Sequence, residues 1–463
     1  MVGATVGGAL LLVAGMLVVD AVTTRDAQHR LETARGAVRT LDGPPEEVWT
    51  ATASAEHGFG LLPGLLVTVE DDAAVARDLD SGAVTWRVPV GDGAVCGPWV
   101  SWHVARTTSR TLVCVAGATA TVVDATGRVL GEREVETGGA LLAPGPAGGL
   151  VRLERVGEPG EPTGGPVAVD PAAGETIDGV RGRDAVVTLE DALTGDVRWR
   201  HELPFQAVPW SCTRWDARTG GEEVDAERLD ALASELLVDV DGCGLAASFT
   251  PDGDRLDDPD LGTDDVVPLA GGRFLVDADR YGSGGTLRAD RVLRADGTLL
   301  LDVPGEVLDP QSTDEPGPGV LIVRDGIDLD AYDDDGARLW THDGARVPEA
   351  VYALAAGTAV VGTGGTVLGL DAVTGEQTWS RFLDDLAGDD GRSTTVRQAF
   401  TDGRCVILGL VDPATGTGSR TVALELSTGA LVWESDDGDR SASLVPVQGR
   451  LLAWDGATVS VLG

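Results

Sequence analysis

Short runs of alternating apolar and polar residues recur along the chain from residue 46 to its end, and each run leads into an acidic turn that contains a glycine. In the clearest copy, Thr366-Val-Leu-Gly-Leu370 is followed by Asp-Ala-Val-Thr-Gly375 and then by Trp379. Alternation predicts a strand with one buried face. The acidic side chain predicts a capped turn, and the glycine supplies a positive φ that a Cβ would resist. The pattern therefore predicts a succession of β-hairpins.

Eight copies of this turn are recognised by their glycine, and successive glycines are 39 to 68 residues apart, a period typical of propeller blades. The turn glycines are Gly82, Gly127, Gly195, Gly253, Gly297, Gly336, Gly375 and Gly429. Five copies have a tryptophan four residues after the glycine, and a sixth tryptophan lies in an isolated strand near the N-terminus. These tryptophans are Trp86, Trp199, Trp340, Trp379, Trp433 and Trp49. We expect them to pack between neighbouring sheets rather than to bind a cofactor.

The two ends of the repeat region complement each other. Residues 46–52 form a tryptophan strand with nothing before it, and the last copy, over 443–462, ends before its own tryptophan strand. Together they predict one blade made from both termini, which would hide two edge strands. The unit over 204–262 contains an irregular insertion that we interpret as partly helical over 225–237, so we do not count it as a full blade. We predict an all-β propeller of about eight four-stranded blades, with seven or nine allowed.

The N-terminus differs from the rest of the chain. Residues 1–19 carry no charge, and a helix of that length would span about 28 Å, close to the thickness of a bilayer core. We predict an uncleaved transmembrane anchor over 1–22, a helical stem and linker over 23–43, and the propeller over 44–463. A cleaved signal peptide and a buried core helix are the alternatives, but there is no basic segment before the apolar run and no clean cleavage site after it.

The cysteines bear on the compartment. Cys96 and Cys114 flank a hairpin-like stretch, and Cys212 and Cys243 bracket the insertion, so two local disulfides would suit an oxidising location. Five ordinary buried thiols are the alternative, and Cys405 lies in a strand pattern typical of a core thiol.

The membrane orientation has evidence on both sides. Four arginines follow the apolar run, which would favour a cytoplasmic propeller, but acidic residues accompany them. We expect a single-pass protein of the cell membrane with an extracytoplasmic propeller.

Charge narrows the choice of partners. The chain has 35 Arg and no Lys against 75 Asp and Glu, which gives a formal charge of −40. This balance argues against nucleic acid, because phosphate binding needs clustered cations. The absence of lysine excludes a P-loop and a Schiff-base lysine.

Candidate chemistry is sparse, and we assign no catalytic residue and no metal site. The histidines, none at metal-ligand spacing from another, are His29, His57, His103, His201 and His342. Two aspartate clusters could in principle collect Ca²⁺, but neither fits the EF-hand frame, and solvated loops are the favoured interpretation. One cluster holds Asp252, Asp254, Asp257, Asp258, Asp260, Asp264 and Asp265; the other holds Asp328, Asp330, Asp333, Asp334 and Asp335.

The D-x-x-T-G-x-x-x-W repeat resembles that of the PQQ-like (pyrroloquinoline-quinone-like) propeller family. The resemblance groups the chain with quinoprotein alcohol dehydrogenases, BamB-type outer-membrane assembly lipoproteins and membrane-anchored bacterial proteins of unassigned role. The dehydrogenases hold Ca²⁺ with Glu, Asn and Asp, and several carry a disulfide between adjacent cysteines, whereas this chain has no Asn and no Cys-Cys pair. It also lacks the lipidated cysteine of the BamB type.

The resemblance therefore favours a non-catalytic, membrane-anchored binding or scaffold module at the cell envelope, with no cofactor and with a protein or peptide partner. A divergent PQQ/Ca-dependent quinoprotein oxidoreductase is the alternative, and a sensor domain for another membrane protein is a third.

Overall fold

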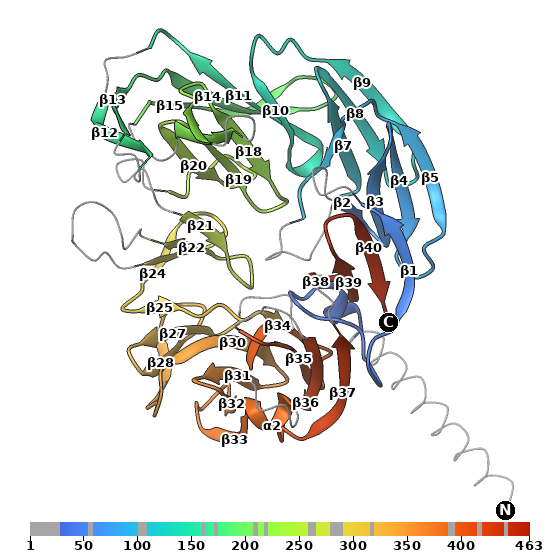
Figure 1. The fold of residues 1–463 in the computed structure, drawn as a ribbon, viewed down its shortest axis with the longest axis vertical. Helices are drawn as coiled ribbons and strands as arrows, with labels where there is room; N and C mark the ends of the chain where they lie inside the picture. The colour runs from blue at the N-terminus through green and yellow to red at the C-terminus, as the bar shows by residue number, and fades with distance from the viewer. Residues whose placement is uncertain are drawn as a thin grey trace, which may run out of the picture.

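The computed structural model describes thirteen stretches of the chain: residues 28–53, 59–100, 109–159, 163–170, 175–206, 212–216, 221–257, 265–277, 290–314, 319–387, 394–413, 419–438 and 443–463. The all-β prediction is confirmed, because almost every regular element in these residues is a strand. Nine sheets of three to five strands follow one another around a ring (Figure 1), and two further two-stranded hairpins stand outside it. We call the nine sheets blades and number them in chain order.

Blades 1 to 3 are four-stranded antiparallel sheets. Blade 1 contains β2 (Phe59–Leu62), β3 (Leu65–Glu70), β4 (Ala73–Asp78) and β5 (Val84–Pro89). Blade 2 contains β6 (Val95–Gly97), β7 (Thr111–Ala116), β8 (Thr119–Asp124) and β9 (Val129–Glu134). Blade 3 contains β10 (Leu141–Pro144), β11 (Gly149–Val156), β14 (Asp184–Asp191) and β15 (Val197–Leu203), with a 3₁₀ turn, η1 (Pro146–Gly148), after β10.

Blades 4 to 6 are less regular. Blade 4 has three strands, β18 (Leu229–Ala233), β19 (Val238–Gly242) and β20 (Leu245–Phe249). Blade 5 contains β21 (Asp265–Pro268), β22 (Phe274–Asp277), β23 (Arg291–Leu293) and β24 (Leu299–Asp302). Blade 6 contains β25 (Glu306–Val307), β27 (Leu321–Asp325), β28 (Asp328–Tyr332) and β29 (Arg338–His342).

Blades 7 to 9 complete the ring. Blade 7 contains β30 (Pro348–Ala355), β31 (Thr358–Thr363), β32 (Thr366–Asp371) and β33 (Gln377–Phe382), with β26 (Ser312–Thr313) added parallel to β30 and a short helix, α2 (Leu383–Ala387), after β33. Blade 8 contains β34 (Thr395–Thr401), β35 (Cys405–Val411), β36 (Ser419–Glu425) and β37 (Leu431–Gly438). Blade 9 contains β38 (Ser443–Val447), β39 (Arg450–Trp454), β40 (Thr458–Leu462) and β1 (Glu47–Thr52).

The core of the described residues is divided into eleven hydrophobic clusters, and nine of them each join one blade to the next. The cluster between blades 9 and 1, for example, packs Val447 and Leu452 against Leu61 and Leu66. Corresponding clusters join each further pair of consecutive blades, so the ring is closed. A sheet that is apolar on both faces cannot bury itself alone, and this arrangement lets each blade bury both faces against its neighbours.

Blade 9 is built from both ends of the chain. β1 pairs antiparallel with β40, and Trp49 lies opposite Val461. The backbone groups of Glu46 and Gly463 exchange hydrogen bonds of 2.9 Å in both directions. Because the first strand is held by the last, the two ends of the chain close the ring together.

The blade count is nine rather than the favoured eight, and the difference comes from blade 4. The prediction of a partly helical stretch over 225–237 is wrong. β18 occupies Leu229–Ala233 and pairs with β19 throughout its length. Exposed and less exposed residues alternate along β18, and Ala233 is buried against blade 3. A helix there would remove the first strand of blade 4, so packing against the neighbouring blade overrides the local helical pattern.

The N-terminal part of the chain is described from residue 28. Residues 28–33 are helical, and from Ala37 the chain runs extended across blades 8 and 9. Within the described part of the chain, no helix has the length and apolar character needed to cross a membrane. The predicted anchor over 1–22 lies outside the described residues.

Candidate binding face

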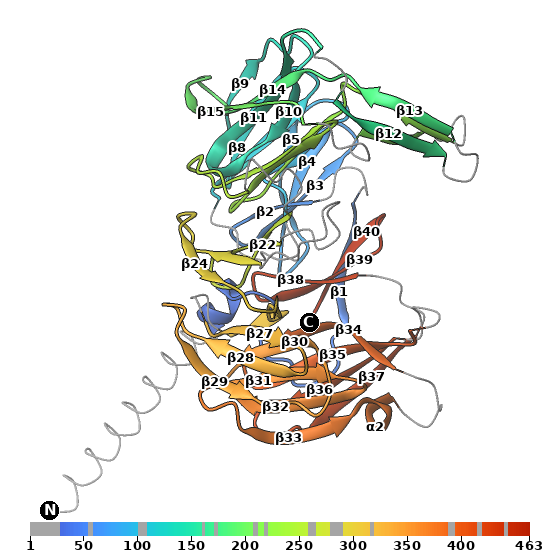
Figure 2. The ribbon, with the colours of Figure 1, turned by 90° about the vertical axis from the view of Figure 1, so that its left-hand side faces the viewer.

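The order of strands gives the ring two distinct faces. In an antiparallel blade, the turn after the first strand and the turn after the third strand lie at one end, and the remaining connections lie at the other. Residues 28–42, which we call the stem segment, lie on the face made by the first and third turns, and we call this the stem face. β12 (Thr163–Asp170) and β13 (Glu175–Val180) form a hairpin that extends from the opposite face (Figure 2), which we call the hairpin face.

The repeat residues lie at the stem-face side of the blade interfaces. The indole N–H of each of five tryptophans donates to a turn carbonyl of the next blade, which follows an acidic residue in four cases and Thr250 in the case of Trp199; Trp379, for example, donates to Leu426 at 2.7 Å. The other four pairs are Trp49 with Leu79, Trp86 with Ala125, Trp199 with Pro251 and Trp340 with Ala372. The tryptophans therefore seal successive blades.

The turn glycines have a second role that their sequence pattern does not reveal. A Cβ on Gly429 would lie 2.6 Å from the Trp379 ring, and Gly429 also has a φ of +65°. Gly82, Gly127, Gly253 and Gly375 lie in the same way beneath the tryptophan of the preceding blade. The glycine is needed for the turn and for the close approach of the ring.

Three turn glycines follow a blade without a repeat tryptophan. At Gly195 the guanidinium of Arg133 occupies the place of the missing tryptophan. Its Nε donates to the Ala192 carbonyl at 2.9 Å, the position that accepts from a tryptophan in other blades. Near Gly297 the closest side chain is Leu256, and near Gly336 it is Leu300. Arg133 could not be recognised from the repeat pattern, because it lies six residues after Gly127 rather than four.

The closing blade uses the stem segment in the same way. Trp433 of blade 8 faces blade 9, in which the chain ends occupy the place of the third turn. Its indole N–H donates to the carbonyl of Leu41 at 3.3 Å. The stem segment therefore supplies the acceptor that a turn supplies between other blades.

Two hairpins are inserted at the hairpin face around blades 3 and 4. β12–β13 lies between the second and third strands of blade 3, and a hairpin of β16 (Thr213–Asp216) and β17 (Gly221–Val224) lies between blades 3 and 4. β12 contacts β17, so the two hairpins support each other. Figure 2 shows β12–β13 extending away from the ring.

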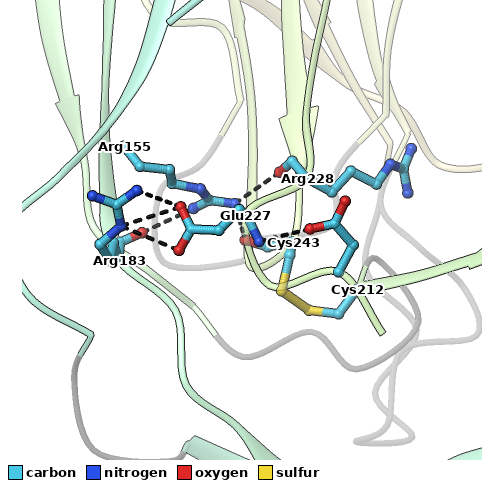
Figure 3. Close-up of a disulfide and its surroundings, with 7 residues drawn as sticks. Arg155, Arg183, Cys212, Glu227, Arg228 and Cys243 are labelled. Carbon is cyan, nitrogen blue, oxygen red and sulfur yellow. Dashed lines mark hydrogen bonds and ion pairs between the residues drawn. A yellow bond between two sulfur atoms is a disulfide. The ribbon is translucent and has the colours of Figure 1, made fainter. Parts of the chain in front are cut away.

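A disulfide fixes the base of the second hairpin to blade 4. Cys212 precedes β16, and Cys243 lies in the turn between β19 and β20; their sulfur atoms are 2.04 Å apart (Figure 3). Both cysteines are buried, with Phe205 and Ala226 packed against them. The backbone N–H of Asp225 also donates to the Cys212 carbonyl at 2.9 Å, so both ends of the hairpin are tied to the same point.

Arg155 joins three chain segments beside this disulfide (Figure 3). Its guanidinium donates to the carbonyls of Arg183, Arg228 and Cys243 at 2.8, 2.9 and 2.6 Å. Burial lowers the pKa of Arg155 from its ordinary value, and the nearby Glu227 opposes that shift. The side chain therefore joins both hairpin bases to blade 4 at one point.

Arg183 and Glu227 form the outer part of the same cluster. The Nε of Arg183 donates to both carboxylate oxygens of Glu227 at 3.1 Å, and its Nη2 forms a further short contact. The hydrogen bond from Arg183 lowers the pKa of Glu227. This bidentate pair crosses from the end of β13 to the end of β17 and holds the two hairpin bases together.

An aromatic side chain fills the remaining gap. A Cβ on either Gly182 or Gly244 would overlap the ring of Phe205, so the ring is held between two glycine backbones. The N–H of Phe205 donates to Asp184 Oδ1 at 2.8 Å, and the N–H of Gln206 donates to Gly244 at 2.7 Å. The paired cysteines were candidates from the sequence, whereas Arg155, Arg183, Phe205 and Glu227 were not.

The remaining cysteines lie away from this face. Cys96 and Cys114 are paired directly across β6 and β7 of blade 2, with an S–S distance of 2.03 Å. Cys405 is a free, buried thiol in blade 8, and burial raises its pKa.

The other candidate side chains do not converge. His57, His103, Asp258, Asp260 and Asp264 lie outside the described residues. Asp257 accepts from the N–H of Ser248, Asp328 from that of Gly344, and Asp333 from its own turn. His201 and His342 each bond a turn-glycine carbonyl of the next blade. No group of three or more His, Cys, Asp or Glu suited to a metal occurs in the described stretches.

Comparison with known proteins points to the same repeat. The family model described as "Outer membrane protein assembly factor BamB", a PQQ-like repeat model, matches residues 316–463, about a third of the chain. No curated protein matches the sequence.

Several solved structures have similar folds. BamB from Moraxella catarrhalis is 12% identical with a TM-score of 0.39, and the match covers 90% of this chain and 99% of that one. The quinohemoprotein alcohol dehydrogenase ADHIIG from Pseudomonas putida is 13% identical with a TM-score of 0.39, covering 95% and 79%. A europium-containing methanol dehydrogenase is 13% identical with a TM-score of 0.35, covering 88% and 84%. Because these scores are below 0.5, the fold assignment rests on the nine blades and their interfaces.

Proposed function

We propose that this chain is a membrane-anchored, non-catalytic propeller that acts as a binding or scaffold module at the cell envelope, and that its partner binds the hairpin face. The observation that carries the proposal is the base of the two inserted hairpins. One disulfide, the Arg155 hydrogen bonds and the Arg183–Glu227 pair fix this base to blades 3 and 4. Recognition elements are typically loops or hairpins that a rigid scaffold positions in this way.

The nature of the partner follows from charge and from the family model. A chain with a net charge of −40 favours a protein or peptide partner with complementary positive charge, and it disfavours nucleic acid. The matched family model is that of an outer membrane protein assembly factor, so an assembly role supports a scaffold rather than an enzyme.

The proposed location is the cell membrane, with the propeller outside the cytoplasm. The uncharged run over residues 1–19 supports a single-pass anchor. The two disulfides support an oxidising compartment, because cytosolic thiols are normally kept reduced.

Excision of the outer hairpin tests the binding role. In one variant a short Gly-Ser turn replaces residues 159–181, and in a matched control the exposed Val373 in a stem-face turn is changed to Ser. Both full-length chains are expressed in the native host, crosslinked and purified. We expect the set of crosslinked proteins from the wild-type chain to survive in Val373→Ser and to be lost in the hairpin variant. Equal crosslinking by all three would contradict the proposal.

A titration tests the rival oxidoreductase function. PQQ is titrated with Ca²⁺ into the full-length protein in detergent, and binding heat and thermal stabilisation are measured. We expect neither signal. Micromolar or tighter binding together with turnover of an alcohol or sugar in the presence of an electron acceptor would contradict a non-catalytic role.

A further inference from the structure

The stem segment is part of the folded ring rather than a free tether. Leu31, Ala34, Ala37 and Val38 are all buried, and Leu31 lies against the blade 8 turn at Gly403. The residues before them, 28–30, are exposed on the stem face. The chain therefore enters the fold at this face.

Backbone hydrogen bonds attach the stem segment to blades 8 and 9. The N–H of Val38 donates to Thr401 at 2.8 Å, and the N–H of Thr401 donates back to Gly36 at 3.2 Å. The next residue, Arg39, donates its N–H to Gly449 at 2.8 Å. The segment thus crosses two consecutive blades through their first turns, and the crossing does not depend on flexible side chains.

A second set of contacts reaches β26, the strand added to blade 7, and the residues just before it. The N–H of Thr313 donates to the Arg35 carbonyl at 2.7 Å, and the Arg35 guanidinium pairs with Asp309. Gly36 has a φ of +67°, and a Cβ there would overlap the backbone of Gln311 and Ser312. The close fit at Gly36 means that the segment is seated in one position.

Little chain separates this docked segment from the uncharged run. Residues 20–27 are eight residues, which span about 12 Å as a helix and at most about 28 Å when extended. As a helix, the form that the sequence predicts for the stem, the tether is shorter than the roughly 20 Å of strand between the two faces, so it keeps the stem face near a bilayer that holds residues 1–19. The site of docking therefore decides which face is near the lipid.

We infer that the docked stem segment holds the stem face toward the bilayer and presents the hairpin face away from it. This inference rests on the proposed membrane anchor and adds the orientation of the propeller. The stem face therefore lies opposite the lipid surface. The propeller stands at a distance from this surface and does not insert into it.

The stand-off follows from the charges on the stem face. Its third turns carry aspartates whose carboxylates accept hydrogen bonds from the turn, which lower their pKa and keep them ionised: Asp78, Asp124, Asp296 and Asp371. A ring of carboxylates is repelled by anionic head groups. The docked stem segment holds the stem face in place against that repulsion.

Energy transfer to labelled lipid tests the orientation. The full-length chain is placed in phosphatidylcholine–phosphatidylglycerol vesicles whose head groups carry an acceptor. A donor is attached at Val373→Cys in one sample and at Phe382→Cys in another. Both native residues are exposed. Val373 precedes β33 of blade 7 at the stem face, and Phe382 is the last residue of β33, at the hairpin face. Cys405 is buried, and the unsubstituted chain measures any background label.

The two labels should report different distances from the lipid. Because a six-residue strand separates the two ends by about 20 Å, we expect roughly twofold or greater transfer from position 373. Gly36→Val should abolish the difference while the chain still floats with the vesicles, because a β-branched side chain cannot occupy that position. Arg128→Ala, which removes an exposed ion pair on the same face, should leave the difference intact.

The outcomes separate this inference from the proposed anchor. Equal transfer from both positions in a chain that floats with vesicles would overturn the orientation and leave the anchor standing. A chain that does not float would instead contradict the membrane anchor. A circular dichroism and thermal unfolding check ensures that Gly36→Val is folded. Arg35→Ala, which removes the pair with Asp309 but keeps the backbone contacts of the stem segment, provides a milder variant in which the difference should shrink.

Discussion

Blades 6, 7 and 8 join one another through repeat tryptophans, whereas blades 3, 4 and 5 form an arc that contains two inserted hairpins, a disulfide and the three-stranded blade 4. In the regular arc, Trp340 and Trp379 each pack on the turn glycine of the next blade and donate to its backbone. In the irregular arc only Trp199 does so. The family model covers residues 316–463, which include most of the regular arc.

The difference shows how one ring can combine a repeated mode of blade-to-blade packing with a specialised surface. Five of the tryptophans pack on the turn glycine of the next blade, and the turns that they meet differ in length by one residue. Where the preceding blade has no repeat tryptophan, other contacts appear: Arg133 beside Gly195, and Leu256 beside Gly297. The Cys212–Cys243 disulfide and Arg155 then hold the inserted hairpins, which the repeat contacts do not reach.

Removal of a tryptophan in the regular arc should have the largest effect on stability. Trp379→Ala deletes a buried ring and its hydrogen bond to Leu426, so we expect a loss of about 3–5 kcal/mol in the free energy of unfolding. Chemical denaturation measures it. Phe382→Ala, in the same strand but exposed, is the control and should cost less than about 0.5 kcal/mol. Similar losses in the two variants would show that the tryptophan does not seal the interface.

Removal of the hairpin disulfide should come next. It joins cysteines 31 residues apart, and we expect the double substitution of Cys212 and Cys243 by Ala to cost about 2–4 kcal/mol. Amide exchange should rise in β16 and β17 and stay unchanged in blades 6 to 8. The matched control replaces Cys96 and Cys114, which lie within one sheet, and should leave exchange in the hairpins unchanged. Uniform loosening of the whole ring in the first variant would contradict a local role.

The turn glycines offer a smaller and sharper contrast. Gly429→Ala brings a Cβ to 2.6 Å from the Trp379 ring, whereas at Gly297 the nearest atom, in Leu256, would be 3.4 Å away. Both positions have a positive φ, so Gly297→Ala should cost about 1 kcal/mol and Gly429→Ala about 1–3 kcal/mol more. Thermal unfolding of the two variants side by side provides the measurement. Equal costs would mean that only the turn conformation requires glycine.

The pH dependence of the irregular arc is the smallest predicted effect. The pKa of Asp239 is raised from 3.8 to about 6, chiefly by burial; the hydrogen bond from Ser248 opposes the rise, and the nearby charges of Asp265, Asp257 and Asp241 add to it. The folded state therefore binds more protons than the unfolded state between these values, so the contribution of Asp239 to stability falls as pH rises from 4 to 6. Unfolding of the wild-type chain and Asp239→Asn is compared across that range. The wild type should lose on the order of 1 kcal/mol relative to the variant, and parallel curves would contradict the assignment.

The all-β fold could be predicted because its signals are local. An acidic residue, a glycine and a tryptophan at fixed spacing identify a turn and the strand after it, and five such copies set the period. The blade count was harder, because β18 lies in a stretch whose local pattern favours a helix and becomes a strand only through pairing with β19. The second role of the glycines depends on the approach of a ring from another blade, which no local pattern records.

Only some residues of the hairpin face could be predicted from the sequence. Cysteine spacing could suggest Cys212 with Cys243, since both bracket one insertion. Arg155 and Phe205 could not be selected, because their importance comes from segments up to 88 residues away in the chain that meet only in the folded ring. The seating of Gly36 against Ser312 is another long-range contact of this kind.

Site-specific photocrosslinking in cells is the most direct test of the central claim, that the hairpin face binds the partner. A photoreactive residue is placed at the exposed Arg181, directly after β13, or at Val373 on the stem face of the full-length chain. We predict a discrete protein adduct from position 181 and none of that size from position 373. The same adducts from both positions, or an adduct only from position 373, would contradict the assignment of the hairpin face.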